Sequence, residues 1–452
     1  MHRLFGTDGI RGIANEDLSC ERATQIGRAL GTLLSSRHKY RPKVLIGMDT
    51  RLSSPMLACA IAAGLCSAGS DALHLGIVPT PAVAFLVKKY NAKAGVMISA
   101  SHNPFPYNGI KIFSDTGFKL SDELEEQIES IVLDNTPPCF PARADEIGHH
   151  RHATDAVDEY LDHLAASVHE RLDGMRLVID CANGAASVTA RRLFEGLGAE
   201  CILLSDVPNG TNINDRCGST DMRVLSEQVV RHKADAGLAF DGDADRFLAV
   251  DERGNEVDGD FIMAILSRHL KESGRLKGNT VVGTVMTNFG FTKFCEREGI
   301  RYVAAKVGDR YVLEMLNQEG LSFGGEQSGH IIFREFATTG DGQLTALQLL
   351  AYMKKSEKAL SELCTVMKKY PQYTVNVTAD RSDKINFFTD EQIREILTSA
   401  EKRIGEDGRI VVRPSGTEPV IRIMAEGEDE EKTEKLAKET AAAIEKRLSE
   451  YR

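Results

Sequence analysis

Short runs of apolar residues alternate with amphipathic stretches along most of the chain. The run that opens "KVLIGMDTR" (43–51) ends at a polar loop, and "SSPMLACAIAAGLCSAG" (53–69) has the pattern of a helix that stops at a glycine. An apolar run followed by a loop of small or polar residues recurs at 94–104, 175–187, 234–246 and 279–290. This alternation predicts α/β units with largely parallel sheets. Ligands of such sheets bind beyond the carboxyl ends of the strands, so these loops are where we expect chemistry.

Changes in the pattern divide the chain into domains. Residues 134–155 contain three prolines and show no periodicity, which predicts a linker. The segment "DERGNEVDGD" (251–260) predicts a hairpin or a short link with Gly254 and Asn255 in its turn. Beyond 368–377 the chain has strands and then one long helical stretch, as in an α+β domain. The length of 452 residues is more than one domain usually has. We predict four domains, at 1–152, 153–252, 253–366 and 367–452.

Composition narrows the class of protein. The net charge is −11 and no long basic block occurs, so nucleic acid is not an expected partner. No run of about 18 apolar residues is present, so we expect no membrane span. The nine cysteines form no Cys-x-x-Cys pair, which favours reduced thiols and a cytoplasmic location over disulfides or a zinc site. The histidine-rich "GHHRH" (148–152) lies in the predicted linker, and we interpret it as solvated.

The strongest chemical signal is "AFDGDADRF", where Asp241, Asp243 and Asp245 occupy alternate positions. Three carboxylates this close repel one another unless a hard divalent cation neutralises them, and magnesium or calcium fits best. An EF-hand is not supported, because Arg246 stands where that loop needs glycine and a strand, not a helix, precedes it. Aspartates can also simply cap a loop. A cation beside an arginine is typical of a phosphate site.

Four further loops carry groups that suit a phosphorylated sugar. "RPSGTEPVIRI" (413–423) offers hydroxyls, amides and two arginines to a phosphate, although a plain turn is the alternative. "FGGEQSGHI" (323–331) sets a glutamate and a serine among glycines that let a ligand approach the backbone. "FGTDGIRG" (5–12) and "NGIKIF" (108–113) present Arg11 and Lys111, which could also be ordinary turn and surface residues. No Walker loop is present.

Ser101 follows the apolar run "GVMISA" and starts the turn "SHNP". A serine at such a place is often only a turn residue, and no Gly-x-Ser-x-Gly elbow supports acyl transfer. A serine that carries phosphate would, however, explain both the carboxylate loop and the separate anion-binding loop. The metal would neutralise the serine-bound phosphoryl group, while the second loop holds another phosphate of the substrate.

Four of these motifs, "SASHNP", "DGDADR", "GGEQSGH" and "RPSGTEPVIR", resemble in the same order the signature loops of the α-D-phosphohexomutases. The resemblance spans the whole chain. It implies an α/β protein of four domains around a central cleft: three related α/β domains with mixed sheets and a smaller α+β C-terminal domain. "FGTDGIRG", "NINDRCGST", "KVGDRYV" and the glutamine of "GEQSGH" are similar to a bacterial branch that acts on amino sugars. One departure is Tyr107, which stands where the family often has an acidic residue.

The resemblance also implies roles for individual residues. Ser101 matches the catalytic phosphoserine and, with Asp241, Asp243 and Asp245, a magnesium site. Residues matched to the surroundings of the transferring phosphoryl group are Arg11, Lys111, Arg246 and His330, with Lys111 and His330 as candidates for proton transfer. Residues matched to sugar and phosphate contacts are Gly308, Asp309, Glu326, Ser328, Arg413, Ser415, Gly416, Thr417 and Arg422.

The expected reaction is interconversion of glucosamine 6-phosphate and glucosamine 1-phosphate, with a hexosamine 1,6-bisphosphate as intermediate or primer. Phosphomannomutase or phosphoglucomutase activity with the same machinery is the alternative. A magnesium phosphatase, in which water resolves the phosphoserine, and a non-catalytic sugar-phosphate binding protein are rivals from other classes. The partners expected are small-molecule sugar phosphates, and the resemblance allows a homodimer.

Overall fold

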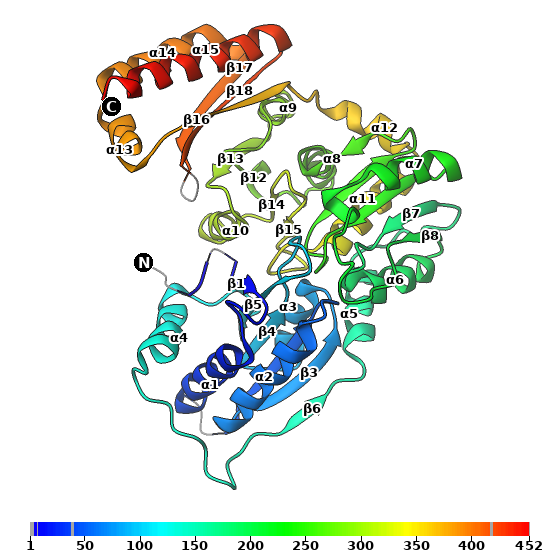
Figure 1. Cartoon of the computed structure of the whole chain (residues 1–452). Helices are drawn as coiled ribbons and strands as arrows, with labels where there is room; N and C mark the ends of the chain where they lie inside the picture. The colour runs from blue at the N-terminus through cyan, green and yellow to red at the C-terminus, as the bar shows by residue number, and fades with distance from the viewer. Residues whose placement is uncertain (1–3, 7, 38–39, 416–418, 452) are drawn as a thin grey trace. The chain divides into compact units, whose positions relative to one another are not determined.

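The computed structural model describes residues 4–6, 8–37, 40–415 and 419–451. They form two compact units (Figure 1). The first unit comprises the chain up to Met286 together with Ile300–Val366, and the second comprises Thr287–Gly299 together with the chain from Met367 onward. No helix in these described ranges is both long enough and apolar enough to cross a membrane.

The first unit begins with a six-stranded sheet in the order β1-β5-β4-β2-β3-β6. Four of its strands are parallel, whereas β1 and β5 run antiparallel to their neighbours. The strands are β1 (Ile10–Ile13), β2 (Lys43–Met48), β3 (Asp71–Ile77), β4 (Ala94–Ile98), β5 (Tyr107–Ser114) and β6 (His150–His152). The helices are α1 (Cys20–Arg37), α2 (Ser54–Ser67), α3 (Thr80–Lys89) and α4 (Asp122–Asp134).

Helices cover both faces of this sheet, as the unbroken apolar runs of its central strands require. Helices α1, α2 and α4 share one core with β2, β4 and β5. On the other face α3 approaches closely over glycines, because a Cβ on Gly47 or Gly95 would lie 2.6 or 2.5 Å from a valine of α3. The predicted strand at 43–51 and the helix at 53–69 are both confirmed.

The second sheet of the first unit has the order β11-β10-β9-β7-β8. Three of its strands are parallel: β7 (Arg176–Asp180), β8 (Glu200–Leu204) and β9 (Ala236–Phe240). The next strand, β10 (Phe247–Asp251), pairs antiparallel with both β9 and β11 (Glu256–Val257). Its helical segments are α5 (Ala156–Ala165), η1 (Ala185–Val188), α6 (Ala190–Gly196), η2 (Gly218–Thr220) and α7 (Arg223–His232). The predicted hairpin is confirmed, since Asp251 donates its amide to the carbonyl of Asn255.

The third sheet has the order β13-β12-β14-β15, in which only the β14–β15 pair is antiparallel. Its strands are β12 (Thr280–Thr284), β13 (Arg301–Ala305), β14 (Phe323–Gly325) and β15 (Ile331–Phe333). The helical segments in this part are α8 (Gly259–Glu272), η3 (Lys277–Asn279), α10 (Asp309–Gln318), α11 (Gly342–Ser356), α12 (Leu360–Leu363) and η4 (Cys364–Val366). All three sheets of the first unit are therefore mixed, as the family resemblance implies.

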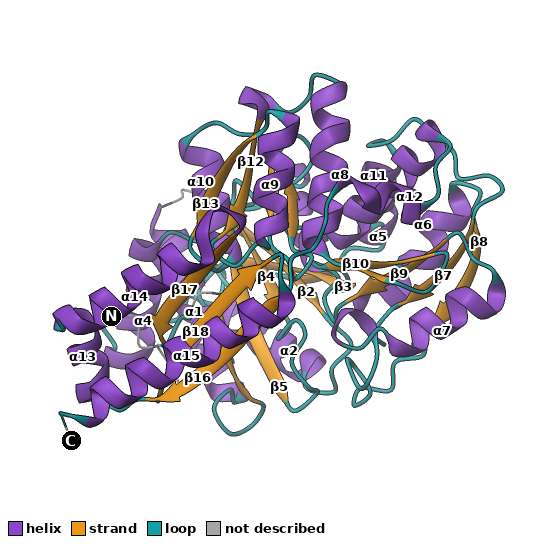
Figure 2. Ribbon diagram, turned by 90° about the horizontal axis from the view of Figure 1, so that it is seen from above, coloured by secondary structure: helices purple, strands orange, loops and turns teal. Residues whose placement is uncertain are grey.

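The second unit is built on an antiparallel three-stranded sheet, β16-β18-β17. Its elements are α9 (Phe289–Glu298), β16 (Gln372–Thr378), α13 (Arg381–Thr389), α14 (Glu391–Ile404), η5 (Gly405–Asp407), β17 (Gly408–Pro414), β18 (Val420–Gly427) and α15 (Glu430–Ser449). Helices α14 and α15 run along this sheet (Figure 2) and share an apolar core with its strands. The prediction of an α+β C-terminal part is confirmed.

The predicted linker needs one correction. Residues 135–149 contain no helix or strand, but His150–His152 form β6, which pairs in parallel with β3 at the sheet edge. This strand escaped prediction because all three of its residues are exposed, so it shows no alternation of apolar and polar positions. The interpretation of these histidines as solvated is confirmed.

Candidate active site

Ser101 sits at the carboxyl end of β4, in a loop with strained backbone. Its φ angle is +53°, a region that non-glycine residues seldom adopt. The residue is buried, and its amide donates to the hydroxyl of Ser99 over 2.9 Å. The turn that follows the strand therefore holds the Ser101 side chain in one direction, which a nucleophile needs.

A buried arginine holds this serine loop in place. The guanidinium of Arg51 donates to the carbonyl oxygens of Ser101 at 2.9 Å and Asn103 at 2.8 Å, and it also bonds those of Pro104 and Tyr107. Its Nε pairs with Asp49 at 2.8 Å, and both side chains are fully buried. Arg51 thus satisfies four loop carbonyls at once, a task for which a planar guanidinium is suited.

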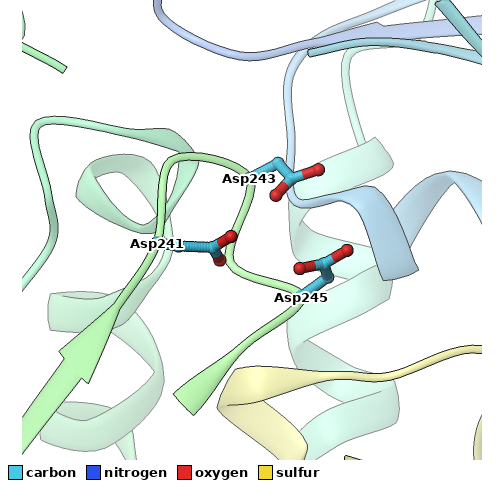
Figure 3. A group of neighbouring side chains, drawn as sticks. All are labelled: Asp241, Asp243 and Asp245. Atoms are coloured by element: carbon cyan, nitrogen blue, oxygen red, sulfur yellow. The ribbon is translucent and has the colours of Figure 1, made fainter. Parts of the chain in front are cut away.

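The three aspartates lie together in the loop between β9 and β10 (Figure 3). The Ser101 hydroxyl donates to Asp241 over 2.7 Å, and the Thr80 hydroxyl donates to Asp243 over 2.6 Å. Close approach of the two loops depends on Gly242, because a Cβ there would lie 2.6 Å from the carbonyl oxygen of Ser101. Residues 140 positions apart in the sequence thereby share one site.

These carboxylates fit a divalent cation. One oxygen from each lies within 4.8 Å of the others, and all three residues are buried. Burial, together with the charges of Asp245 and Asp243, raises the pKa of Asp241 well above its ordinary value. One oxygen of Asp243 and one of Asp245 are buried yet accept no hydrogen bond. Oxygen donors left in this state are what a hard cation such as Mg²⁺ binds.

Lys111, on β5, is the cation that this cluster already contains. Its ammonium is buried, 2.9 Å from Asp243, 3.1 Å from Asp8 and 3.4 Å from Asp245. Burial alone would lower the pKa of Lys111, but the three carboxylates outweigh it and raise the pKa well above the usual value. The side chain is therefore an ammonium at neutral pH. Asp8 completes the cluster by pairing with Arg11 at 2.5 Å.

Arg11, Arg246 and His330 border the same site. Among the residues that the structure describes, the buried Nε atoms of Arg11 and Arg246 have no hydrogen-bond partner, although Nε of Arg246 lies 3.9 Å from a carboxylate oxygen of Asp245. The Nδ1 atom of His330 lies 3.6 Å from Asp245, while its Nε2 accepts the amide of Gly340 over 3.0 Å. This pattern places the proton of a neutral ring on Nδ1. The two arginines suit a phosphoryl group.

A cavity of about 360 Å³ opens beside these groups. Glu326 and Ser328 line it, together with Gly308 and Asp309, and the Gly308 amide donates to Glu326 over 3.0 Å. The other lining residues are Asp8, Arg11, Asp245, Arg246, Thr284, Met286, Val307, Gln327 and His330. The predicted sugar-contacting loops thus meet Arg11, Arg246 and His330 at one cavity, whereas Ser101 and Lys111 are not among its lining residues.

The predicted phosphate clamp belongs to the second unit. Arg413 on β17 and Arg422 on β18 are direct partners across the antiparallel hairpin, and Ser415 follows β17. Gly416 and Thr417 lie outside the described residues. Two arginines on opposite strands of one hairpin can bind a phosphate from both sides.

Several residues of the site were not predicted. Asp8 and Arg51 lie within motifs that the sequence highlights, "FGTDGIRG" and "KVLIGMDTR", but nothing in those motifs marks their roles. Asn214 was also missed, and its side-chain amide donates to the carbonyl oxygens of Ser101 and Asn103. Thr80 begins α3 and gives no sequence signal at all.

Comparison with protein families agrees with this geometry. Family models of the four phosphoglucomutase/phosphomannomutase domains match this chain in order. The α/β/α domain I matches residues 2–138, domain II 158–254, domain III 258–370 and the C-terminal domain 375–443. The chain therefore belongs to the phosphoglucomutase/phosphomannomutase family, a group of α-D-phosphohexomutases, and it is an enzyme of the phosphotransferase type. The domain limits given above from the sequence stay a prediction.

Individual relatives show which members of this family the chain resembles. The phosphoglucosamine mutases of Acetivibrio thermocellus and Caldicellulosiruptor saccharolyticus are each 50% identical to this chain, over 99% of it and 100% of their own length. A phosphoglucomutase/phosphomannomutase family protein from Burkholderia thailandensis has a similar fold, with a TM-score of 0.82, 22% identity and coverage of 99% and 98% of the two chains. An N-acetylphosphoglucosamine mutase from Aspergillus fumigatus, solved with GlcNAc-6P and magnesium, gives a TM-score of 0.70, 18% identity and coverage of 99% and 96%.

Proposed function

We propose that the protein interconverts glucosamine 6-phosphate and glucosamine 1-phosphate through a phosphoserine at Ser101 and a glucosamine 1,6-bisphosphate intermediate. The observation that carries the proposal is the contact of the Ser101 hydroxyl with Asp241, inside a buried carboxylate cluster that fits magnesium. Full-length similarity to phosphoglucosamine mutases supports the choice of sugar. The product would feed UDP-N-acetylglucosamine and cell-wall synthesis in the cytoplasm. A homodimer is part of the same proposal.

Each half of the reaction is one phosphoryl transfer. A free hydroxyl of the sugar phosphate attacks the phosphorus on Ser101, the bond from phosphorus to the serine oxygen breaks, and the bisphosphate forms. The hydroxyl loses one proton and the serine gains one, so protons balance. The bisphosphate then turns over and returns its other phosphate to Ser101, which leaves the isomeric monophosphate and regenerates the phosphoenzyme.

Asp241, Asp243 and Asp245 are the residues that would hold Mg²⁺, together with an oxygen on Ser101. When bound, the metal supplies positive charge that offsets charge on the transferring phosphoryl group. Arg11 and Arg246 serve the same group with their unused Nε donors. The buried position of these residues keeps water away and strengthens each electrostatic contact.

Lys111 and His330 are the proposed proton carriers. Lys111 is the better candidate for the proton donor, because its carboxylate neighbours keep its ammonium protonated. The Nε2 atom of His330 already accepts the Gly340 amide, so its ring would need to exchange that bond before taking a proton. Glu326, Ser328, Gly308 and Asp309 would bind the sugar hydroxyls.

The second phosphate needs a site that accepts either end of the sugar. We assign it to Arg413, Ser415 and Arg422 with Gly416 and Thr417. Two guanidinium groups and backbone amides recognise a phosphate through charge and hydrogen bonds, with no requirement for which carbon carries it. Sugar specificity therefore falls to the cavity of the first unit.

Replacing Lys111 by methionine is expected to lower kcat by about 10²–10⁴-fold, the usual contribution of proton transfer by a positioned side chain. A steady-state assay of isomerisation measures it. Lys88→Gln is the control, since this exposed lysine near the end of α3 is remote from the carboxylates in the sequence and should change kcat little. A Lys111→Met enzyme with near-normal kcat would remove Lys111 from the mechanism.

Removing divalent metal is expected to abolish turnover, and Mg²⁺ should restore it. Asp243→Asn should weaken Mg²⁺ activation by at least about tenfold, because a carboxylate ligand becomes a neutral amide. Titration of activity against free Mg²⁺ measures the change. Asp251→Asn is unsuitable as a control, because Asp251 is itself buried and hydrogen-bonded. The exposed Asp115→Asn is the better comparison. Full activity in a chelator would contradict the metal assignment.

The choice of sugar is tested by phosphorus NMR of turnover with Mg²⁺ and a bisphosphate primer. Glucosamine 6-phosphate, glucose 6-phosphate and mannose 6-phosphate are compared at equal concentration. Fastest conversion of glucosamine 6-phosphate is the expected result. Faster conversion of the other two would move the enzyme to phosphoglucomutase or phosphomannomutase activity. Release of inorganic phosphate without isomerisation would identify a phosphatase instead.

A further inference from the structure

Lys119 joins two carboxylates that come from distant parts of the first unit. Its ammonium lies 2.6 Å from Asp8 and 2.5 Å from Asp309, at sequence separations of 111 and 190 residues. Only 16% of its side chain is exposed. The backbone of Lys119 is itself held beside β5, through a bridge to Phe113. Lys119 is thus presented by the same strand region as Lys111.

The two carboxylates, of Asp8 and Asp309, belong to different parts of the site. Asp8 also pairs with Lys111 and Arg11, the cations beside the carboxylate triad. Asp309 is the first residue of α10, and the preceding Gly308 donates its amide to Glu326. The Lys119 ammonium therefore connects the phosphoryl-transfer cluster to the loop that lines the sugar cavity.

Lys119 itself is not among the residues that line that cavity. It lines a neighbouring cavity of about 310 Å³, and the two cavities share Asp309 and His330 in their walls. Burial alone would lower the pKa of Lys119, but Asp309 and Asp8 raise it, so the group stays charged and does not act as a base. Its position points to a role exercised through its two carboxylate partners.

We propose that Lys119 is a positioning residue of the mutase reaction: its ammonium, held between Asp8 and Asp309, sets the Gly308–Asp309 loop and thereby Glu326 in register with the phosphoryl group on Ser101. The inference rests on the proposed function. A bisphosphate that must be bound in two orientations needs a sugar loop held at one distance from the phosphorus, because a displacement of about 1 Å can cost 10²-fold in rate. Without Lys119, Asp8 and Asp309 repel each other across the gap and the loop moves outward.

The test compares Lys119→Met, Lys119→Arg and Lys93→Met in the full-length enzyme, with the sugar phosphate that the unmodified enzyme converts fastest. Lys93 is the matched control, since its ion pair with Asp115 measures 4.0 Å and that partner is exposed. Lys119→Met is expected to lower kcat/KM by about 100-fold, while Mg²⁺ activation keeps its midpoint. Lys119→Arg, which keeps the charge, should recover to within about tenfold of the unmodified enzyme. If Lys119→Met does not fold, Lys119→Gln takes its place.

A double-mutant cycle with Asp309→Asn separates positioning from general weakening of the fold. If Lys119 acts through Asp309, the double variant loses no more than Asp309→Asn alone. Additive losses, or a folded Lys119→Met enzyme with kcat/KM within about threefold of normal, would overturn the inference. The proposed function fails in a different way, because the unmodified enzyme would then either isomerise none of the sugar phosphates or convert glucose or mannose phosphate faster than glucosamine 6-phosphate.

Discussion

Ser101→Ala is expected to lower isomerase turnover by at least about 10⁴-fold, because it removes the atom to which the phosphoryl group is attached in every catalytic cycle. The fold should persist, since the hydrogen bonds that the structure gives this hydroxyl are those with Asp241 at 2.7 Å and with Nδ1 of His102 at 3.4 Å. The variant should also fail to take up phosphate from a sugar bisphosphate. Intact-protein mass spectrometry measures that uptake, and a coupled assay measures turnover.

The control for this variant is Ser114→Ala, which removes a half-buried hydroxyl from the last residue of β5. It should retain turnover and gain the mass of one phosphate as the unmodified enzyme does. If Ser101→Ala isomerises at a substantial fraction of the normal rate, or is still phosphorylated at one equivalent, Ser101 is not the phosphoryl carrier.

Arg51→Met is expected to lower the melting temperature of the first unit by about 10 °C. The change leaves four loop carbonyls without their donor and the buried Asp49 without its cation, and breaking a buried ion pair from one side costs about 3–5 kcal/mol. Turnover should fall by about 100-fold even for the folded fraction, because the Ser101 loop is no longer held. Scanning calorimetry and the coupled assay measure the two effects.

Arg191→Gln is the matched control. Arg191 forms an ion pair of 2.7 Å with Glu195 on a solvent-facing helix surface, so its loss should shift melting by less than about 2 °C. Arg51→Lys should lie between the two, since a lysine keeps the charge but cannot serve four carbonyls from a planar fork. An Arg51→Met enzyme that melts and turns over normally would contradict the positioning role.

The parts of the structure that could be predicted are those with a strong local pattern. Uninterrupted apolar runs predicted β4 and β9, and the polar residues just after them placed Ser101 and Asp241 at strand ends. Ligand loops gather at such ends, so a shared site was the expected consequence. The antiparallel hairpin at 251–260 followed from its turn residues.

The parts that could not be predicted depend on contacts between distant segments. Arg51 appears in the sequence as one more charged loop residue, and only the folded loop shows its four carbonyl partners. Lys119 meets Asp8 and Asp309 because three separate segments converge, which no local pattern records. β6 has no buried side chain to mark it. Its backbone pairs with β3, and the rings of His150 and His152 contact the ring of His74 on β3, a residue far away in the sequence.

In the proposed reaction, one serine passes its phosphoryl group to the sugar and receives another in return. The direct test is to load Ser101 with radiolabelled phosphate from a labelled bisphosphate, remove the excess, and add unlabelled glucosamine 6-phosphate with Mg²⁺. The label should leave the protein within a few turnovers and appear in the bisphosphate and then in both monophosphates, while the protein stays phosphorylated. Label that stays on Ser101 during continued isomerisation, or that appears only as inorganic phosphate, would contradict the account.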